Sequence, residues 1–307
     1  MTPAASRVDP VVPALVGAAC ISSSAVVVRL AHTAAGTTAF YRCVLALPVL
    51  VLLAVLEQRR AGPRAVGDRV RAVAAGALLG LDLVLWTHAI YDVGAGIATV
   101  LGNLQVLFVA AIAWVVFRER PGARFLVTLP VVMVGVVLVA GLVSHSGSGY
   151  HPVAGILYGL GTSVSYAGFI LVLRRSASDA THVAAPLAEA TFGAAAASLL
   201  LGLAVGEMPF GLSLGSFGWL LCLALVSQTV GWLFITWSLA RLPAAVASLL
   251  LLFQPAAALV LAAAVLSQRP SLLQIVGALL VCGGVLYAVR GERETSAAAT
   301  SAEPTPG

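Results

Sequence analysis

The segment "AGIATVLGNLQVLFVAAIAWVVFRERPGARFLVTLPVVMVGVVL" (residues 95–138) decides the fold, because its pattern recurs later in the chain. The later copy, "RLPAAVASLLLLFQPAAALVLAAAVLSQRPSLLQIVGALLVCGGVLY" (residues 241–287), aligns with it at a shift of 149 residues. At this shift Gln105 meets Gln254, and in both copies an Arg-Pro pair separates two apolar runs. Self-similarity at a fixed distance is the mark of an internal repeat. The sequence therefore predicts two homologous halves.

The composition indicates a membrane protein with many spans. Of the 307 residues, 60% are hydrophobic and 9% are charged, and the mean hydropathy is +1.03. Soluble domains, in contrast, carry about 25% charged residues. The net charge of +5 comes from 17 basic residues, all of them Arg, which lie mainly in short loops between apolar runs. That placement is typical of membrane topology and not of a phosphate-binding face, so no nucleic acid partner is expected.

Ten apolar runs in the sequence each have a length suited to a membrane-crossing helix. A helix needs roughly 20 apolar residues to cross a hydrocarbon core of about 30 Å, whereas a barrel strand needs only about 10 with alternating polarity. Because lipid offers no partner to unpaired backbone groups, runs of this length are predicted to be helices. The ten predicted spans cover residues 11–28, 36–56, 71–90, 94–117, 124–143, 153–173, 184–205, 214–238, 243–266 and 271–289.

Five predicted spans in each half give the repeat an inverted topology. Because five is odd, the second half must enter the membrane from the opposite side. The predicted fold class is all-α integral membrane, with ten transmembrane helices in two five-helix inverted-topology repeats. The predicted parts are a cytoplasmic N-terminal segment (1–10), the first repeat (11–143), an external linker (144–152), the second repeat (153–289) and a disordered cytoplasmic tail (290–307).

The arginines predict that both termini lie in the cytoplasm. With the N-terminus inside, 14 arginines flank the spans on the cytoplasmic side, against Arg29 and Arg269 outside and Arg42 within the second span. This asymmetry predicts a multi-pass protein of the cytoplasmic (inner) membrane. The four cysteines lie singly in predicted spans, and His145 and His151 lack a third ligand, so neither a metal site nor a cofactor is expected.

The chain resembles the EamA-type family of the drug/metabolite transporter superfamily. The resemblance rests on the two quoted stretches, with their pattern of small residues, Pro and a helix-end Glu-Arg, and it extends over essentially all ten spans. The second half departs from the pattern, since Gln268-Arg269 stands where the first half has Glu119-Arg120. The resemblance implies efflux or exchange of small metabolites, often amino acids, and it implies no fixed set of catalytic residues.

Three ionisable residues inside predicted spans are candidates for substrate binding or proton coupling. Asp82 lies 11 helical rises from Arg71, or about 16 Å at 1.5 Å per residue, which places it near the bilayer centre. A carboxylate there costs at least ~2.5–3.5 kcal/mol on insertion scales, so a functional role is expected. Arg42 lies roughly 9 Å from the outer boundary, and its planar guanidinium suits a substrate carboxylate. Glu189, near the cytoplasmic mouth, is a candidate second titrating site.

Each of these three residues also has a purely structural interpretation. A protonated or hydrogen-bonded carboxyl would explain Asp82, and snorkelling or an ion pair would explain Arg42. Glu189 is equally explained as an acidic side chain among hydrated lipid headgroups. The sequence leaves both interpretations open at each position.

Uncharged polar and aromatic residues near the middle of the spans are predicted to line a cavity between the repeats. Interhelical hydrogen bonding or plain packing would explain each of them as well. These residues are Trp86, Asn103, Gln105, Ser165, Tyr166, Gln228 and Gln254. Pro255 is a candidate gating residue, with an ordinary packing kink as the alternative.

Together these features predict a secondary active transporter that exports or exchanges small polar metabolites, such as amino acids, by alternating access with proton coupling. A passive facilitator of the same substrates and a non-transporting scaffold or receptor are the alternatives. The expected partners are a small-molecule substrate, membrane lipid and protons, and the chain is expected to act as a monomer or homodimer.

Two other classes of function find no support in the sequence. No nucleotide-binding G-x-x-x-x-G-K loop occurs, and Lys is absent, so transport is expected to be gradient-driven or passive. An intramembrane hydrolase would need a nucleophile beside a base, and the serines at membrane depth have only His88 as a remote candidate. The chain is therefore not expected to be an enzyme.

Overall fold

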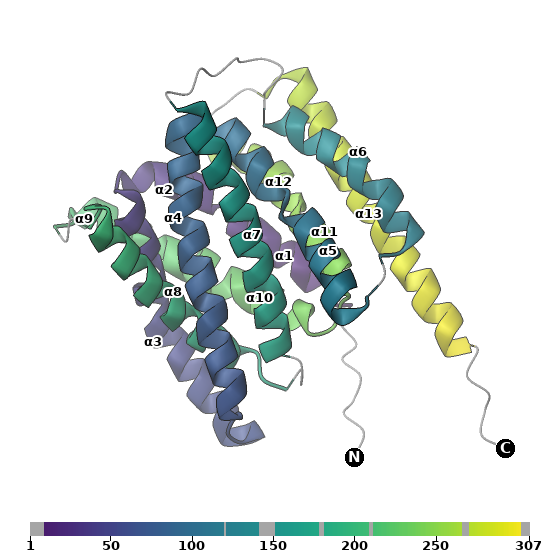
Figure 1. Cartoon of the computed structure of the whole chain (residues 1–307), viewed down its shortest axis with the longest axis horizontal. Coiled ribbons are helices and arrows are strands. Elements are labelled where there is room, and N and C mark those ends of the chain that lie inside the picture. Colours follow the sequence, from purple (N-terminus) through teal and green to yellow (C-terminus); the bar gives the residue numbers. More distant parts are fainter. Residues whose placement is uncertain are drawn as a thin grey trace.

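The computed structural model describes residues 9–119, 121–140, 151–177, 181–208, 211–265 and 270–301. Within these ranges the regular elements are all helices (Figure 1). In chain order they are α1 (Val11–Ser22), α2 (Ser24–Ala31), α3 (Ala35–Ala61), α4 (Val66–Asn103), α5 (Gln105–Phe117), α6 (Ala123–Val139), α7 (Pro152–Ser176), α8 (Ala184–Ala204), α9 (Leu214–Cys222), η1 (Leu223–Gly231), α10 (Trp232–Leu239), α11 (Ala244–Leu251), α12 (Phe253–Val265) and α13 (Leu272–Ser301).

Eight helical segments of the described chain are long and apolar enough to cross a membrane, which confirms a multi-pass membrane protein. Two further apolar helices, Ala123–Val139 and Leu272–Ala288, are shorter. At 1.5 Å per residue, the 17 residues of α6 extend about 26 Å, slightly less than the roughly 30 Å of a hydrocarbon core. The count of ten crossing helices and the inverted topology therefore stay predictions. The eight segments are Val11–Val28, Ala35–Ala61, Val66–Ala89, Ile97–Phe117, Val153–Ser176, Ala184–Ala204, Leu214–Leu239 and Ala244–Leu261.

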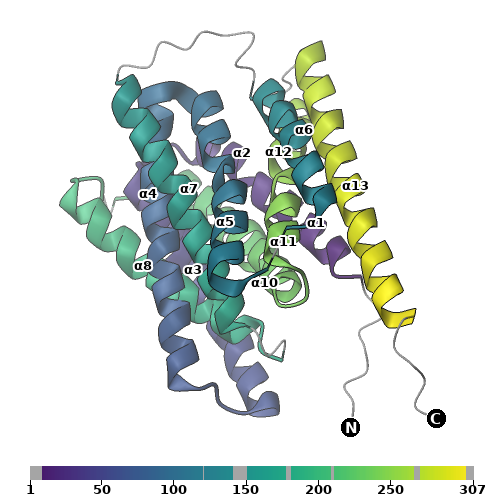
Figure 2. The same cartoon turned by 45° about the vertical axis from the view of Figure 1, so that its right-hand side comes forward.

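The third and fourth predicted spans correspond to two of these segments, Val66–Ala89 and Ile97–Phe117, but the helical backbone continues between them. Residues 71–90 and 94–117 are predicted as separate helices, but α4 continues without interruption to Asn103, and the break comes at Leu104. The connecting residues contain no proline, so nothing removes a backbone hydrogen bond there. Figure 2 shows α4 turning over at its upper end before the chain descends into α5.

Helices from the two halves of the chain interlock. α4 packs along α7 and α8, α3 packs along α8, and α6 packs along α13. We call α3, α4, α7 and α8 the four-helix group. Figures 1 and 2 show α6 and α13 side by side as a pair at the edge of the molecule. Neither half of the chain therefore forms a separate packed unit.

Glycines allow the closest approaches within the four-helix group. A Cβ atom on Gly76 of α4 would lie 1.8 Å from the carbonyl oxygen of Ala190 on α8. A Cβ atom on Gly193 of α8 would lie 2.2 Å from the carbonyl oxygen of Val73. Lipid supplies no hydrophobic force between helices, so close backbone contact of this kind is a main source of association in membranes.

A π-helix, η1, interrupts the eighth predicted span between α9 and α10. Its nine residues include Thr229, whose hydroxyl donates to the carbonyl oxygen of Ala224, five residues earlier, at 2.8 Å. π-helical segments are rare and occur frequently at functional sites. η1 packs against α1 and α3, at the level where polar residues gather in the bundle.

Candidate functional site

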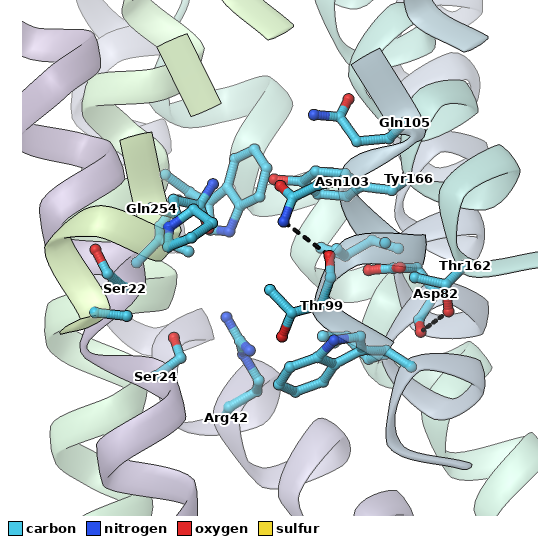
Figure 3. Close-up of a pocket in the computed structure, with 18 residues that line it drawn as sticks. Ser22, Ser24, Arg42, Asp82, Thr99, Asn103, Gln105, Thr162, Tyr166 and Gln254 are labelled. Carbon is cyan, nitrogen blue, oxygen red and sulfur yellow. Dashed lines mark hydrogen bonds between the residues drawn. The ribbon is translucent and has the colours of Figure 1, made fainter. Parts of the chain in front are cut away.

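A cavity of about 210 Å³ lies inside the bundle between helices of the two halves (Figure 3). Its lining comes from α3, α4, α5 and α7 and from α1, α2, α10 and α12. Eight of the eleven predicted site residues line it: Arg42, Asp82, Trp86, Asn103, Gln105, Tyr166, Gln254 and Pro255. The sequence prediction missed four small polar lining residues: Ser22, Ser24, Thr99 and Thr162.

The two charged residues of the cavity lie on different walls. Arg42 is on α3 and Asp82 on α4, and in Figure 3 they appear on either side of Thr99. Both are almost completely buried, with exposed fractions of 7% and 8%. Among the described residues they form no ion pair with each other. The cavity thus presents a positive and a negative group that a ligand could bridge.

Neutral acceptors from η1 hold the guanidinium of Arg42. Its Nε donates to Oε1 of Gln228 at 3.2 Å, and its Nη2 donates to Oγ of Ser227 at 3.3 Å. The amide nitrogen of Gln228 in turn donates to the hydroxyl of Thr191 on α8 at 3.2 Å. The hydroxyls of Ser227 and Ser24 share a hydrogen bond of 2.7 Å. Gln228 therefore contacts Arg42, which lines the cavity, but does not line the cavity itself.

The carboxylate of Asp82 has a different environment. Among the described residues no hydrogen bond to its side-chain oxygens is found, and the hydroxyl of Thr162 approaches only its backbone oxygen, at 3.5 Å. Trp86, one helical turn away, lines the same cavity, as the spacing predicts. A buried carboxylate without hydrogen bonds is costly in its charged form, so a proton or a cationic group would stabilise it.

Aromatic residues close one end of the cavity. The rings of Phe169 and Trp232 meet edge to face with centroids 4.8 Å apart, and Tyr166 lies 6.1 Å from each of them. Tyr166 and Trp232 line the cavity, while Phe169 packs behind them. Such pairs contribute stability beyond the burial of their area, so this wall is expected to be rigid.

Helix breaks occur at matching positions of the two repeats. α4 gives way to α5 at Leu104, and α11 gives way to α12 at Leu252, one residue from the position that the shift of 149 predicts. Gln105 and Gln254, the equivalent glutamines, follow these breaks and line the cavity. Backbone hydrogen bonds to the third residue before continue at both breaks, from the N–H of Leu104 to Leu101 and from the N–H of Leu252 to Leu249, each at 3.0 Å.

Pro255 lies in the first turn of α12, directly after the second break. A proline there removes none of the hydrogen bonds of α12, because the first N–H groups of a helix have no intrahelical acceptor. Its ring lines the cavity. The discontinuity therefore precedes Pro255, and the proline does not kink the middle of a helix.

Two predicted site residues lie away from the cavity. Glu189, on α8, forms ion pairs with Arg64 and with Arg69, the latter at 3.0 Å from Nε to Oε1. Arg64 also donates to the hydroxyl of Ser176 at 2.6 Å. These contacts join the start of α4 to α7 and α8, which fits the structural interpretation of Glu189. Ser165 is buried on α7 outside the lining.

A further acidic residue, Glu57, joins α3 to the start of α8. The carboxylate of Glu57, near the end of α3, accepts hydrogen bonds from the backbone N–H groups of Val183, Ala184 and Ala185 at 2.7, 3.2 and 2.8 Å. A carboxylate at a helix N-terminus satisfies free donors and interacts favourably with the helix dipole. Polar contacts therefore join α8 both to α3, through Glu57, and to α4, through Arg69.

Comparisons with known proteins agree with this architecture. One solved crystal structure superimposes with a TM-score of 0.77 over 92% of this chain and 99% of that chain, at 16% sequence identity, which shows a shared fold. No curated protein matches the sequence. The sequence model of the EamA-like transporter family matches residues 11–141 and again residues 153–290. With both halves matched, the chain belongs to the EamA-like transporter family.

Proposed function

We propose that the protein is a secondary active transporter that exports or exchanges small zwitterionic metabolites, such as amino acids, by alternating access with proton coupling. Its membrane is the cytoplasmic (inner) membrane, with both termini in the cytoplasm. Family membership supports transport in general. The observation that carries the substrate class is the cavity with Arg42 and Asp82 on different walls.

The cavity suits a small ligand with both charges. A guanidinium binds a carboxylate through two parallel hydrogen bonds, and a carboxylate accepts hydrogen bonds from an ammonium. A zwitterion would complete both interactions at once and leave neither buried charge unpaired. At about 210 Å³ the space is smaller than the roughly 300–1,000 Å³ of pockets for drug-sized ligands, so a small metabolite is favoured.

Proton coupling is proposed to operate at Asp82. Its carboxylate needs a positive partner when the cavity is closed to water, and a proton and a substrate ammonium are alternatives for that role. Binding of one would then release the other. The location of the cavity between the two repeats supports an alternating-access cycle, because inverted repeats exchange access around a central site.

Transport by purified protein in liposomes tests this function. Vesicles are loaded with a mixture of the twenty common amino acids, and efflux is measured with the external pH either equal to or below the internal pH. Efflux that accelerates with the pH difference is the expected result. Equal efflux in both conditions would indicate a passive facilitator, and no efflux beyond that of empty vesicles would contradict transport of this substrate class.

The Arg42→Lys variant tests the carboxylate contact. Lysine keeps the charge but loses the paired N–H groups, so transport of a carboxylate substrate should fall by about 10-fold, equivalent to one lost charged hydrogen bond. Transport of the corresponding carboxamide should change little. Arg71→Lys is the matched control, because Arg71 is exposed on α4 and pairs with Asp68. Equal losses for acid and amide would instead indicate a structural role for Arg42.

A further inference from the structure

The contacts of Arg42 occupy only one edge of its guanidinium. That group carries five N–H donors in a fixed plane. The Nε–H and the neighbouring N–H of Nη2 form the side-on edge, and these point to Gln228 and Ser227. The other three N–H groups, on Nη1 and Nη2, have no acceptor among the described residues, and Figure 3 shows the guanidinium reaching into the cavity.

We infer that Ser227 and Gln228 are positioning residues, which hold Arg42 so that its end-on pair of Nη–H groups faces the ligand. The inference rests on the proposed function for the identity of that ligand, a carboxylate. It concerns two residues that do not line the cavity and act only through Arg42.

The chemistry of the two acceptors suits this role. An amide oxygen and a hydroxyl oxygen fix the direction of the guanidinium but leave its positive charge uncompensated. A carboxylate at position 228 would fix it equally well and neutralise it, which would weaken the attraction for an anionic ligand. The residue types on η1 therefore favour orientation without loss of charge.

The acceptors are themselves held in place. Thr191 on α8 accepts from the amide of Gln228, and Ser24 on α2 shares a hydrogen bond with Ser227. Ser227, Gln228 and Thr191 have exposed fractions of 0%. The acceptors are thus buried, and removal of one of them leaves an N–H of Arg42 without its protein partner.

The π-helix explains how two consecutive residues reach one side chain. A π-helix has more residues per turn than an α-helix, so adjacent side chains diverge less around its axis. Ser227 and Gln228 both point toward α3, whereas the hydroxyl of the next residue, Thr229, donates to a carbonyl oxygen of its own helix. Thr229 therefore provides a matched control on the same segment.

The first test is the structure of the Gln228→Met variant, in which an isosteric side chain lacks the acceptor. The guanidinium of Arg42 is expected to leave its side-on orientation, whereas it should keep that orientation in Thr229→Val. An unchanged Arg42 in Gln228→Met would overturn the inference, whatever the substrate is. If Gln228→Met does not fold, Ser227→Ala supports the same comparison, since it removes a single hydroxyl.

The second test is calorimetric binding of L-leucine and of L-leucinamide, which lacks the carboxylate, to the purified full-length protein. The dissociation constant for L-leucine should rise about 10-fold in Gln228→Met and stay within about 2-fold in Thr229→Val. The constant for L-leucinamide should stay the same in both. Equal losses for both ligands, or unchanged binding of L-leucine, would contradict positioning.

The Gln228→Glu variant separates orientation from charge. Arg42 should keep its side-on contacts in the structure, while L-leucine should bind more weakly because the guanidinium is neutralised. Tighter binding of L-leucine would contradict the argument from neutral acceptors. If the wild-type protein binds no L-leucine but Arg42 moves in Gln228→Met, the positioning role stands and the proposed substrate class fails.

Discussion

Asp82→Asn is expected to abolish the acceleration of transport by a proton gradient and to leave the fold intact. Asparagine keeps the shape of the side chain and an oxygen that accepts hydrogen bonds, but it does not titrate. The variant should therefore still bind substrate, although more weakly, because the charged contact with the substrate ammonium becomes a neutral hydrogen bond. A charged carboxylate at membrane depth costs at least ~2.5–3.5 kcal/mol, so its removal should cause no loss of folded protein.

The decisive measurement is reconstituted transport as a function of external pH, for the wild type and for Asp82→Asn. The rate of the variant with a pH difference should equal its rate without one. A binding assay on the same preparations controls for folding. If the variant keeps the pH dependence of the wild type, Asp82 has a structural role and Glu189 becomes the next candidate for coupling.

Gly76→Ala is expected to cause the largest loss of stability. The new Cβ atom would lie 1.8 Å from the carbonyl oxygen of Ala190 and 2.6 Å from its carbonyl carbon. These are backbone atoms of α8 and cannot rotate away, so α4 and α8 must separate. Overpacking costs typically about 1–3 kcal/mol where side chains adjust, and a backbone clash should reach the upper end of this range or beyond.

Thermal unfolding of the detergent-solubilised protein provides the measurement for this variant. Gly76→Ala should unfold at a markedly lower temperature or elute as aggregate. Gly283→Ala is the matched control, because a Cβ atom on Gly283 of α13 would meet nothing within 4 Å, and alanine favours helix more than glycine does. An unchanged unfolding temperature for Gly76→Ala would contradict the close packing of α4 against α8.

Hydropathy predicted the helical class and the approximate spans, because lipid requires long apolar runs and internal backbone hydrogen bonds. It could not predict that helical backbone continues between the third and fourth spans as far as Asn103, since the glycines near residue 95 permit either a break or continuous helical backbone. It also could not predict the π-helix, because the residues of η1, LALVSQTVG, would also fit an α-helix.

The candidate site was predicted in part from the rarity of polar residues in apolar spans. Asp82 and Arg42 are conspicuous for this reason, and both line the cavity. Ser22, Ser24 and Thr162 gave no such signal, because small polar residues are common wherever membrane helices pack. The ion pairs of Glu189 were not foreseen, because they depend on Arg64 and Arg69, which lie 125 and 120 residues away in the sequence.

The interlocking of the two halves has a consequence for biosynthesis. Arg42 enters the membrane while the acceptors on η1, 185 and 186 residues later, have not yet been made. Likewise, the surface of α4 around Gly76 has no packing partner until α8 has been made. During synthesis the guanidinium must stay near water or the insertion machinery. The early helices cannot reach their final packing, because their partners in the second half are missing. Ribosome stalling or truncation after residue 140 should therefore yield a fragment that cellular quality control degrades, even though four of its helical segments are long and apolar enough to insert.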